Sequence, residues 1–187
     1  MTHIIFSPII LFFSPARYLL NVLTKTSPPV ALADHHDIAD FHSGEASLDD
    51  WLKRRARANQ ASGASRTYVV CEDKRVIGYF ALASGAVTVE SASGRFRRNM
   101  PNPIPVAVLA RLAVDRGWQE RGIGRALFRD AARRVAQAAD SIGIRGIVVH
   151  AISEEAKGFY VALGFDASPR EPMMLMVTLA EVRAALA

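Results

Sequence analysis

A pair of glycines and one tyrosine are the residues of this 187-residue chain whose types and positions point most directly to chemistry. Gly122 and Gly124 follow an apolar run and stand where a helix is predicted to begin, so backbone N–H groups there could approach an anion at the positive end of the helix. Such a turn could hold a pyrophosphate, or the glycines could merely open a tight connection between a strand and a helix. Tyr160 stands near the start of a later predicted helix, where its phenol could donate a proton, although position alone slightly favours a core aromatic beside Phe159 and Phe165.

Two groups of basic residues could contact the phosphates of a nucleic acid. The first is the loop triplet Arg95, Arg97 and Arg98, and the second is the helix triplet Lys53, Arg54 and Arg57. Segment 91–105, which carries the loop triplet, also holds Gly94 and three prolines, so we predict a loop or partly ordered segment there. We favour the loop triplet because it has no evident packing reason to be basic, whereas a basic face on an amphipathic helix is usually only solvated.

The histidines and the single cysteine give no sign of a metal or disulfide site. Cys71 lies in an apolar run, which indicates a buried thiol. His150, at the end of a predicted strand, could line a cleft, but a structural, hydrogen-bonded histidine is the favoured interpretation. His35, His36 and His42 are expected at the surface. Because no cluster of possible ligands has metal-site spacing, we expect no metal.

Composition places these residues in one globular domain. Half of the residues are apolar, 22% are charged and 12 are glycine, which excludes disordered, collagen-like and low-complexity chains. Lys and Arg number 23 against 18 Asp and Glu, giving a net charge of +5, and this excess favours anionic partners such as nucleic acid or phosphorylated cofactors. With one cysteine, a cytoplasmic setting is the default.

Residues 1–26 differ from the rest of the chain. Their apolar runs at 4–13 and 18–23 are interrupted by prolines and by Arg17, so no membrane span is expected, and the first run lacks the basic start of a signal peptide. We predict an N-terminal extension that is disordered or arises from an upstream start, followed by one domain over residues 27–187.

Hydrophobic periodicity and turn signals predict the elements that must position these residues. Helices are predicted from Ser47, as its cap, onward, and at 122–139, 154–163 and 179–187; strands are predicted at 66–72, 76–83, 86–90, 106–114, 147–151 and 173–178. The run 106–114 is apolar apart from Arg111, as expected of a central strand buried on both faces. The element order predicts an α/β layered sandwich, antiparallel at first and parallel around the long helix.

Two motifs resemble the GNAT family of N-acetyltransferases over about residues 30–180. They are the pattern Gln119-x-x-Gly122-x-Gly124 after a buried strand and the run Phe159–Phe165 on the following helix. The resemblance implies a GNAT-type sandwich, a mixed central sheet flanked by helices, with acetyl-CoA as the acetyl donor. It also implies that Tyr160 is the general acid that protonates the leaving thiolate.

The resemblance also implies a cofactor site. Main-chain groups of Leu112, Ala113 and Val114 would pair with the pantetheine arm as an extra strand would. Backbone N–H groups of the turn would hold the pyrophosphate; the turn residues are Gln119, Glu120, Arg121, Gly122, Ile123 and Gly124. The side chains of Arg121 and Arg125 would serve the cofactor phosphates.

Within this family the N-terminal pattern is similar to acetyltransferase toxins of type II toxin–antitoxin pairs, which act on aminoacyl-tRNA. The matching runs are Phe41–Gly44, Leu48–Leu52 and Asn59–Val70. The resemblance implies acetylation of the α-amino group of the amino acid on a charged tRNA, which blocks translation, with the loop triplet near the acceptor side of the cleft. It further implies a ribbon-helix-helix antitoxin, operator DNA bound only through the antitoxin complex, and a homodimer.

Two alternatives stay open. One is an N-acetyltransferase for a protein or small-molecule amine; the other is a non-catalytic module that acts with its antitoxin as an operator-binding corepressor. No general base is evident, and this mildly favours an α-amine, whose pKa of about 7.7–8.0 lies far below the value near 10.4 for lysine. Retention of Tyr160 with both glycines argues against the non-catalytic module.

Overall fold

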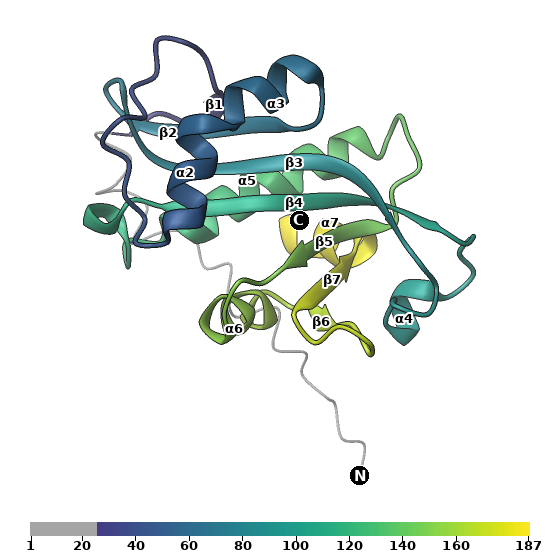
Figure 1. Cartoon of the computed structure of the whole chain (residues 1–187). Helices are drawn as coiled ribbons and strands as arrows, with labels where there is room; N and C mark the ends of the chain where they lie inside the picture. Colours follow the sequence, from purple (N-terminus) through teal and green to yellow (C-terminus); the bar gives the residue numbers. More distant parts are fainter. Residues whose placement is uncertain (1–25) are drawn as a thin grey trace.

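Seven strands form one mixed sheet in the order β1-β2-β3-β4-β5-β7-β6, with helices on both faces (Figure 1). This computed structural model describes residues 26–187, so the predicted extension at 1–26 lies outside the described residues except for Thr26. The strands are β1 (Val30–Ala31), β2 (Arg66–Glu72), β3 (Arg75–Val87), β4 (Ile104–Val114), β5 (Gly146–His150), β6 (Asp166–Ala167) and β7 (Met174–Thr178). The helices are α2 (Ala46–Arg54), α3 (Ala56–Ser62), α4 (Gly94–Arg97), α5 (Ile123–Ala138), α6 (Glu154–Ala162) and α7 (Leu179–Leu186).

The pairing of the strands confirms the predicted α/β sandwich with a mixed sheet. Neighbouring strands are antiparallel throughout, except that β4 and β5 run parallel. The parallel pair is the one joined by the long helix α5, because a crossover of that length is needed to bring the chain back to the same end of the sheet.

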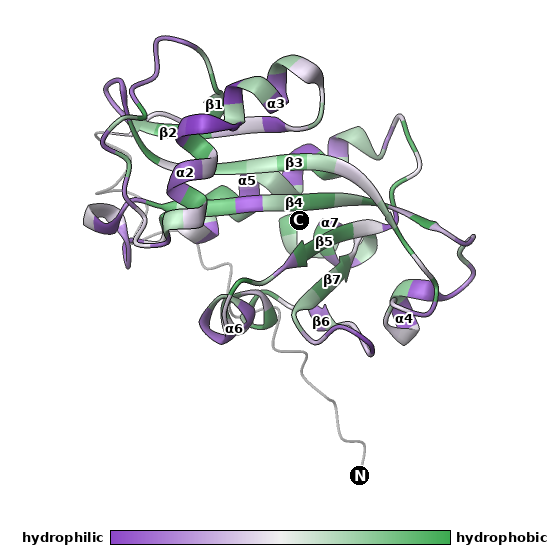
Figure 2. Cartoon of the chain, in the orientation of Figure 1, coloured by the Kyte–Doolittle hydropathy of each residue, from purple (hydrophilic) through white to green (hydrophobic). Residues whose placement is uncertain are grey.

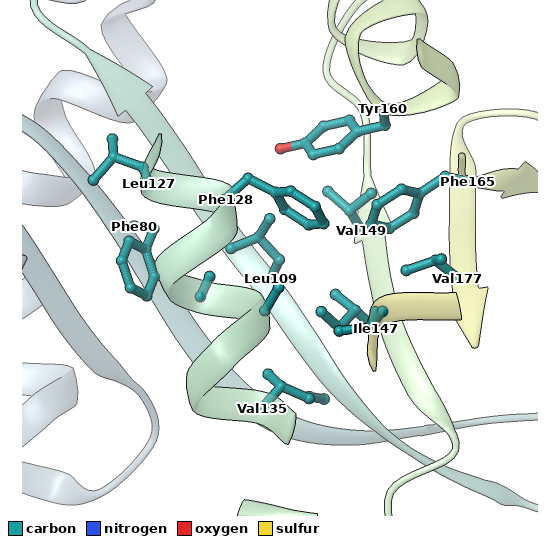
Figure 3. Close-up of a cluster of buried hydrophobic side chains, with 14 of the residues drawn as sticks. Phe80, Leu109, Leu127, Phe128, Val135, Ile147, Val149, Tyr160, Phe165 and Val177 are labelled. Carbon is teal, nitrogen blue, oxygen red and sulfur yellow. The ribbon is translucent and has the colours of Figure 1, made fainter. Parts of the chain in front are cut away.

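Two hydrophobic clusters hold the helices on the sheet. On one face α2 contributes Leu52 to a cluster with Phe41 and Tyr79 of β3. On the other face α5 packs Leu127 and Phe128 against β3, β4, β5 and β7 (Figure 3). Figure 2 shows the strands largely in green and the outward turns of α2 in purple, so the helices are amphipathic as their periodicity predicted.

Several element boundaries differ from the prediction. The strand predicted at 86–90 is not separate, because β3 continues to Val87 and stays paired with β4 over that length. Strands β1 and β6 were missed, since two residues are too few to show a periodicity. Ser47 does not cap α2: the helix begins at Ala46, and the side chain of Glu45 accepts the backbone N–H of Ser47.

The segment predicted as a basic loop at 91–105 contains the short helix α4. Its Phe96 is buried in a third cluster with Ile104 of β4, Val148 of β5 and Met176 of β7. This aromatic side chain, from a part of the chain that looks polar, anchors α4 to the sheet.

The strands β4 and β5 are paired over only a short length. Their register covers Ala107 with Ile147 and Val108 with Val148, after which β4 continues to Val114 beside β3 alone. Figure 1 shows the two strands diverging towards α2 and α6. One edge of β4 therefore stays open along its second half.

A β-bulge lies where this divergence begins. Ala81 pairs with Arg111 and Leu82 pairs with Leu109, so Ala110 is the extra residue on β4. From Ala110 to Leu112 the side chains are only half-buried, which corrects the prediction of a strand buried on both faces.

Candidate active site

A cleft opens where β4 and β5 separate. It encloses about 940 Å³, counting its open mouth. Its lining comes from the start of α2 (Ser47, Leu48), from β4 (Val108, Leu109, Ala110, Arg111, Leu112), from the end of β5 and the loop after it (Val149, His150, Ala151, Ile152), and from α6 (Ala156, Tyr160). None of the lining residues is a carboxylate, and apart from Tyr160 the one lining side chain of a type that commonly accepts a proton is His150.

The open edge of β4 leads from this cleft to the glycine turn. Leu112 lines the cleft, and the side chain of Ala113 is buried beneath it. The carbonyl oxygen of Val114 already accepts a hydrogen bond from the Gln119 side chain at 3.0 Å. An extended ligand on this edge would therefore use the other main-chain groups of the three predicted residues.

The glycine turn presents the start of α5 without a cap. Gly122 occupies the N-cap position in the left-handed region, with φ of 79°, and no side chain caps the helix. The first turn of α5 carries no acidic residue, and the first helical bond runs from the Ala126 N–H to the Gly122 carbonyl. The N–H groups of Ile123 and Gly124 precede this bond and have no partner within the helix, as an anion site requires.

Gly124 is not demanded by the protein's own packing. A Cβ atom there would meet Phe159 at 3.8 Å and Val114 at 3.9 Å, which are ordinary contacts. Glycine at this position leaves clear the space that faces Phe159 and Val114, where a ligand could approach the backbone closely.

Tyr160 projects from the last turn of α6 into the same region, not from near the start of its helix as predicted. The ring packs as a core aromatic, and the role of the phenol as general acid stays a prediction. Its ring is 6% exposed and makes edge-to-face contacts with Phe159 and Phe165. Figure 3 shows the ring above Phe128 and Val149, at the rim of the cluster. Its hydroxyl makes no hydrogen bond to residues 26–187, and burial raises the pKa of this phenol, so it stays protonated at neutral pH.

Comparison with known proteins agrees with this geometry. Residues 63–167 match the family model of the GNAT acetyltransferase domain. The chain belongs to the GNAT acetyltransferase family. The family expected from the glycine and Tyr160 motifs is thereby confirmed.

Individual relatives of this GNAT chain are toxins. It is 53% identical over 158 residues, 84% of its length and 95% of the relative's, to a tRNA-acetylating toxin of Mycobacterium tuberculosis. AtaT complexed with acetyl-methionyl-tRNAfMet matches with a TM-score of 0.79 at 26% identity, covering 87% of this chain and 99% of AtaT. An AtaT mutant bound to the C-terminus of the antitoxin AtaR and acetyl-CoA matches with a TM-score of 0.74 at 26% identity, covering 86% and 97%.

The side chains of the glycine turn, residues 119–124, and of Arg125 differ in their contacts. Gln119 donates from Nε2 to the carbonyl oxygens of Ser43 and Val114, so this side chain braces the turn. The guanidinium of Arg121 lies 4.8 Å from the ring centroid of Trp118, at the mouth of the turn. Arg125 is exposed on the first turn of α5.

A buried carboxylate network fastens the loop before α2 to the turn, and sequence reasoning missed it. Asp49 accepts hydrogen bonds from the N–H (2.8 Å) and Oγ (2.6 Å) of Ser43 and from Nδ1 of His42 (3.0 Å). Asp115 accepts from the N–H groups of His42 and Gly117. The sequence alone does not reveal this role of Asp49, because its partners are brought beside it only by the fold.

The same network changes the acidity of Asp49. Burial opposes ionisation of this carboxyl group, but the hydrogen bonds from Ser43 and His42 outweigh burial and hold the pKa of Asp49 below its ordinary value of 3.8. The carboxylate therefore stabilises the loop in its charged form.

Replacing Asp49 by asparagine is expected to lower the free energy of unfolding by about 1–3 kcal/mol at pH 7, because one amide cannot accept from three donors. The folded pKa lies below 3.8, so this contribution is complete above that value and is lost as the pH falls through the folded pKa. Denaturant unfolding at pH 7 and pH 3.5 should show the difference shrinking at acid pH. Asp50→Asn is the control, since Asp50 makes only an exposed pair with Arg54; a pH-independent difference would contradict the network.

The structure changes the interpretation of three histidines. His150 is exposed and lines the cleft, where a structural histidine was the favoured prediction. His36 is buried, not at the surface, and its Nδ1 accepts the N–H of Ala33; burial and the neighbouring His35 lower its pKa. His42 is exposed as predicted but is oriented by Asp49.

Arg95 of the loop triplet has a structural role, which corrects the view that the triplet has no packing reason to be basic. Its guanidinium pairs with Asp166 of β6 and with Glu181 of α7, the latter at 2.6 Å. Arg145 also donates to the Arg95 carbonyl. Arg95 thus joins α4, β6 and α7, and its charge is already compensated.

Some of the other predicted basic residues also have partners in the fold, and the others are exposed. Arg97 and Arg98 are exposed, and neither forms an ion pair with any described residue. In the helix triplet Arg54 pairs with Asp50, and Arg57 bonds the carbonyl of His36, while Lys53 is exposed. None of these residues lines the cleft, and Figure 1 places α4 at the opposite end of β4 and β5 from α6.

Residues 26–187 contain neither a metal-binding cluster nor a membrane-spanning helix. No group of three or more His, Cys, Asp or Glu side chains in this range could hold a metal ion. No helix in the described range has the length and apolar character of a membrane span. Cys71 is buried as predicted, and burial raises its pKa to about 11, so the thiol is inert.

Proposed function

We propose that this chain is the toxin of a type II toxin–antitoxin pair and transfers an acetyl group from acetyl-CoA to the α-amino group of aminoacyl-tRNA, which blocks translation. The observation that carries the proposal is the 53% identity to a tRNA-acetylating toxin over 95% of that protein. Three features of the structure support it: the uncapped start of α5, the open edge of β4 and the buried phenol of Tyr160.

The residues fit acetyl-CoA. The N–H groups of Gly122, Ile123 and Gly124 would bind the pyrophosphate at the positive end of α5, with Gln119, Glu120 and Arg121 shaping the approach. Arg125 would add positive charge on the same helix turn. Leu112, Ala113 and Val114 would hold the pantetheine arm along β4. When bound, acetyl-CoA supplies the acetyl group as a thioester.

Tyr160 would supply the proton that the leaving sulfur needs. Tyr160 lines the cleft, and its hydroxyl has no hydrogen-bond partner among residues 26–187, so the proton is not committed elsewhere. No carboxylate lines the cleft, where His150 is the one imidazole, so the proposal favours an acceptor amine that is already largely neutral at cellular pH. An aminoacyl ester meets this condition better than lysine does, since its amine is far less basic.

The deciding experiment uses labelled acetyl-CoA with charged total tRNA, uncharged tRNA and a protein extract in parallel. We expect label on the aminoacyl group of charged tRNA alone, released as N-acetyl amino acid on ester hydrolysis. Label only on protein or free amines would support the alternative N-acetyltransferase. Absence of transfer with intact acetyl-CoA binding would support the non-catalytic corepressor module.

The partners and setting are part of the same proposal. We propose a ribbon-helix-helix antitoxin as the partner, operator DNA bound only through that complex, a homodimer, and a cytoplasmic location. AtaT bound to the C-terminus of its antitoxin supports a toxin–antitoxin complex. We further propose that residues 27–187 form the working domain, which a chain beginning at residue 27 would test by retaining full activity.

For the tRNA backbone we propose Arg97 and Arg98. Charge reversal of both to glutamate is expected to weaken tRNA binding about tenfold near 0.1 M salt and to flatten its salt dependence, because each lost phosphate contact removes released counterions. Filter binding across a salt series measures this, with acetyl-CoA affinity as the internal reference. Arg133→Glu, an exposed change on α5, is the matched control; equal tRNA binding by all three proteins would remove α4 from the interface. Arg95→Glu should instead destabilise the fold by breaking its two ion pairs.

A further inference from the structure

One charge interrupts the otherwise apolar strand β4. Arg111 is half-buried, and its guanidinium carbon lies 5.6 Å from the ring centroid of Trp51 on α2. Its Nη1 donates to the carbonyl oxygen of Ala110 at 2.6 Å. The aromatic face and the carbonyl together hold the guanidinium beside the wall of the cleft that α2 forms.

The bulge at Ala110 determines which way this side chain points. In a regular strand Leu109, Arg111 and Ala113 would share one face. Leu109 instead packs in the cluster on the α5 side, whereas Ala113 packs in the cluster on the α2 side. The bulge therefore turns Arg111 towards α2, away from the core beneath α5.

No carboxylate compensates the charge of Arg111. Over residues 26–187 none of the ion pairs includes Arg111, and the cleft itself is lined by no acidic side chain. A half-buried cation without a counter-ion costs free energy, and a guanidinium has five N–H donors, of which one is used on Ala110. The cleft thus offers an anion site that no described protein group fills.

The anion that fits this site belongs to the acceptor. The proposed pyrophosphate site lies beyond the far end of β4, at the start of α5, and residues 112–114 lie between that site and Arg111. An arm that runs along 112–114 from the turn brings its reactive end to Tyr160 and Arg111. Because the phosphates of such an arm stay at the turn, a negative charge that reaches Arg111 would belong to the acceptor.

We propose that Arg111 is a specificity-determining residue that binds the phosphate next to the aminoacylated terminal adenosine, an inference that rests on the proposed function. A guanidinium can donate two parallel hydrogen bonds to a phosphate, which fixes both distance and orientation. Lysine side chains and small neutral amines carry no such phosphate. The contact therefore selects the 3′ end of a charged RNA over other amines.

Two small acceptors isolate this contact: an aminoacyl-adenosine ester, which has no phosphate, and an aminoacyl cytidylyl-adenosine ester, which has one internucleotide phosphate. Both carry the amino acid that is labelled most strongly on charged tRNA. Wild-type protein is expected to show kcat/KM at least about tenfold higher for the dinucleotide ester, the size of one charged hydrogen-bonded contact. Arg111→Met, which keeps an unbranched side chain beside Trp51 but removes the guanidinium, is expected to abolish this preference.

The readout is the ratio of the two kcat/KM values, which a purely structural role would not change. Arg133→Met removes an exposed arginine on α5 and should keep the wild-type ratio. Arg111→Lys retains the charge but not the planar guanidinium, so its ratio should lie between those of the wild type and Arg111→Met. Equal losses on both esters in Arg111→Met, or a wild-type ratio near one, would overturn the role of Arg111 alone. A wild-type protein that acetylates neither ester nor charged tRNA would instead overturn the proposed function.

Discussion

Replacing Tyr160 by phenylalanine is expected to slow acetyl transfer to charged tRNA by about 10² to 10³-fold, the usual contribution of a positioned general acid. The substitution removes only the hydroxyl, which bonds to no described residue, and keeps the ring that packs against Phe159 and Phe165. The free energy of unfolding and the Kd for acetyl-CoA should therefore stay close to wild type. Single-turnover kinetics with preformed acetyl-CoA complex measures the chemical step directly.

Tyr79→Phe is the matched control for this prediction. Tyr79 is also a buried tyrosine, but its hydroxyl donates to the carbonyl of Leu48 at 2.8 Å. Its loss should cost about 1 kcal/mol of stability and leave the transfer rate within a few-fold of wild type. If Tyr160→Phe retained the wild-type rate, or if both variants lost activity equally, Tyr160 would not be the proton donor.

The raised pKa of Tyr160 adds a pH test. A free tyrosine ionises near pH 10, and burial moves the pKa of Tyr160 above that value. The phenol then stays protonated through the alkaline range, so the transfer rate should not fall between pH 8 and about pH 10. A descending limb in that range that Tyr160→Phe abolished would contradict the burial argument.

Replacing Gly124 by aspartate is expected to raise the Kd for acetyl-CoA by about a hundredfold or more. The new carboxylate would lie beside the N–H groups proposed to bind the pyrophosphate, and like charges about 4 Å apart repel by several kcal/mol near a protein surface. The fold should tolerate the change, since a Cβ at Gly124 makes only ordinary contacts. An acidic residue in the first turn of α5 should even raise the free energy of unfolding by up to about 1 kcal/mol.

The prediction is specific because Gly124→Asp is expected to weaken acetyl-CoA binding while raising the free energy of unfolding. Calorimetric titration gives the Kd and thermal unfolding gives the stability of the same sample. Gly143→Asp adds the same charge at a position where a Cβ would meet nothing within 4 Å, and should leave the Kd unchanged. Gly124→Ala separates bulk from charge and should weaken binding by roughly tenfold. Unchanged affinity in Gly124→Asp would place the pyrophosphate elsewhere.

Features that depend on neighbouring residues could be predicted well. The strands β2 and β3 and the helix after the glycines follow from short-range spacing and backbone preference, although α5 begins at Ile123 and Gly122 is its N-cap. The role of these residues toward acetyl-CoA stays a prediction. Short elements such as β1 and β6 could not be predicted, because two residues are too few to show the alternation of apolar and polar residues that marks a strand.

Features that depend on distant partners could not be predicted. Arg95 seemed a free cation because its partner Asp166 is 71 residues away in the chain. Phe96 seemed part of a polar loop because the pocket that buries it is assembled from three strands. Asp49 and Asp115 seemed to be ordinary turn and helix-end residues until the fold brought His42 and Ser43 beside them.

By itself the sequence determined the family and the order of most of the elements. It also determined the position of the glycine turn and of Tyr160 within the family's second motif. Only the tertiary structure decided which charges are already compensated and which face an open cleft: Arg95 is paired, whereas Arg111 is not. The physical reason is the range of the forces involved. Backbone conformation depends on a few adjacent residues, while burial and ion pairing depend on segments that meet only after folding.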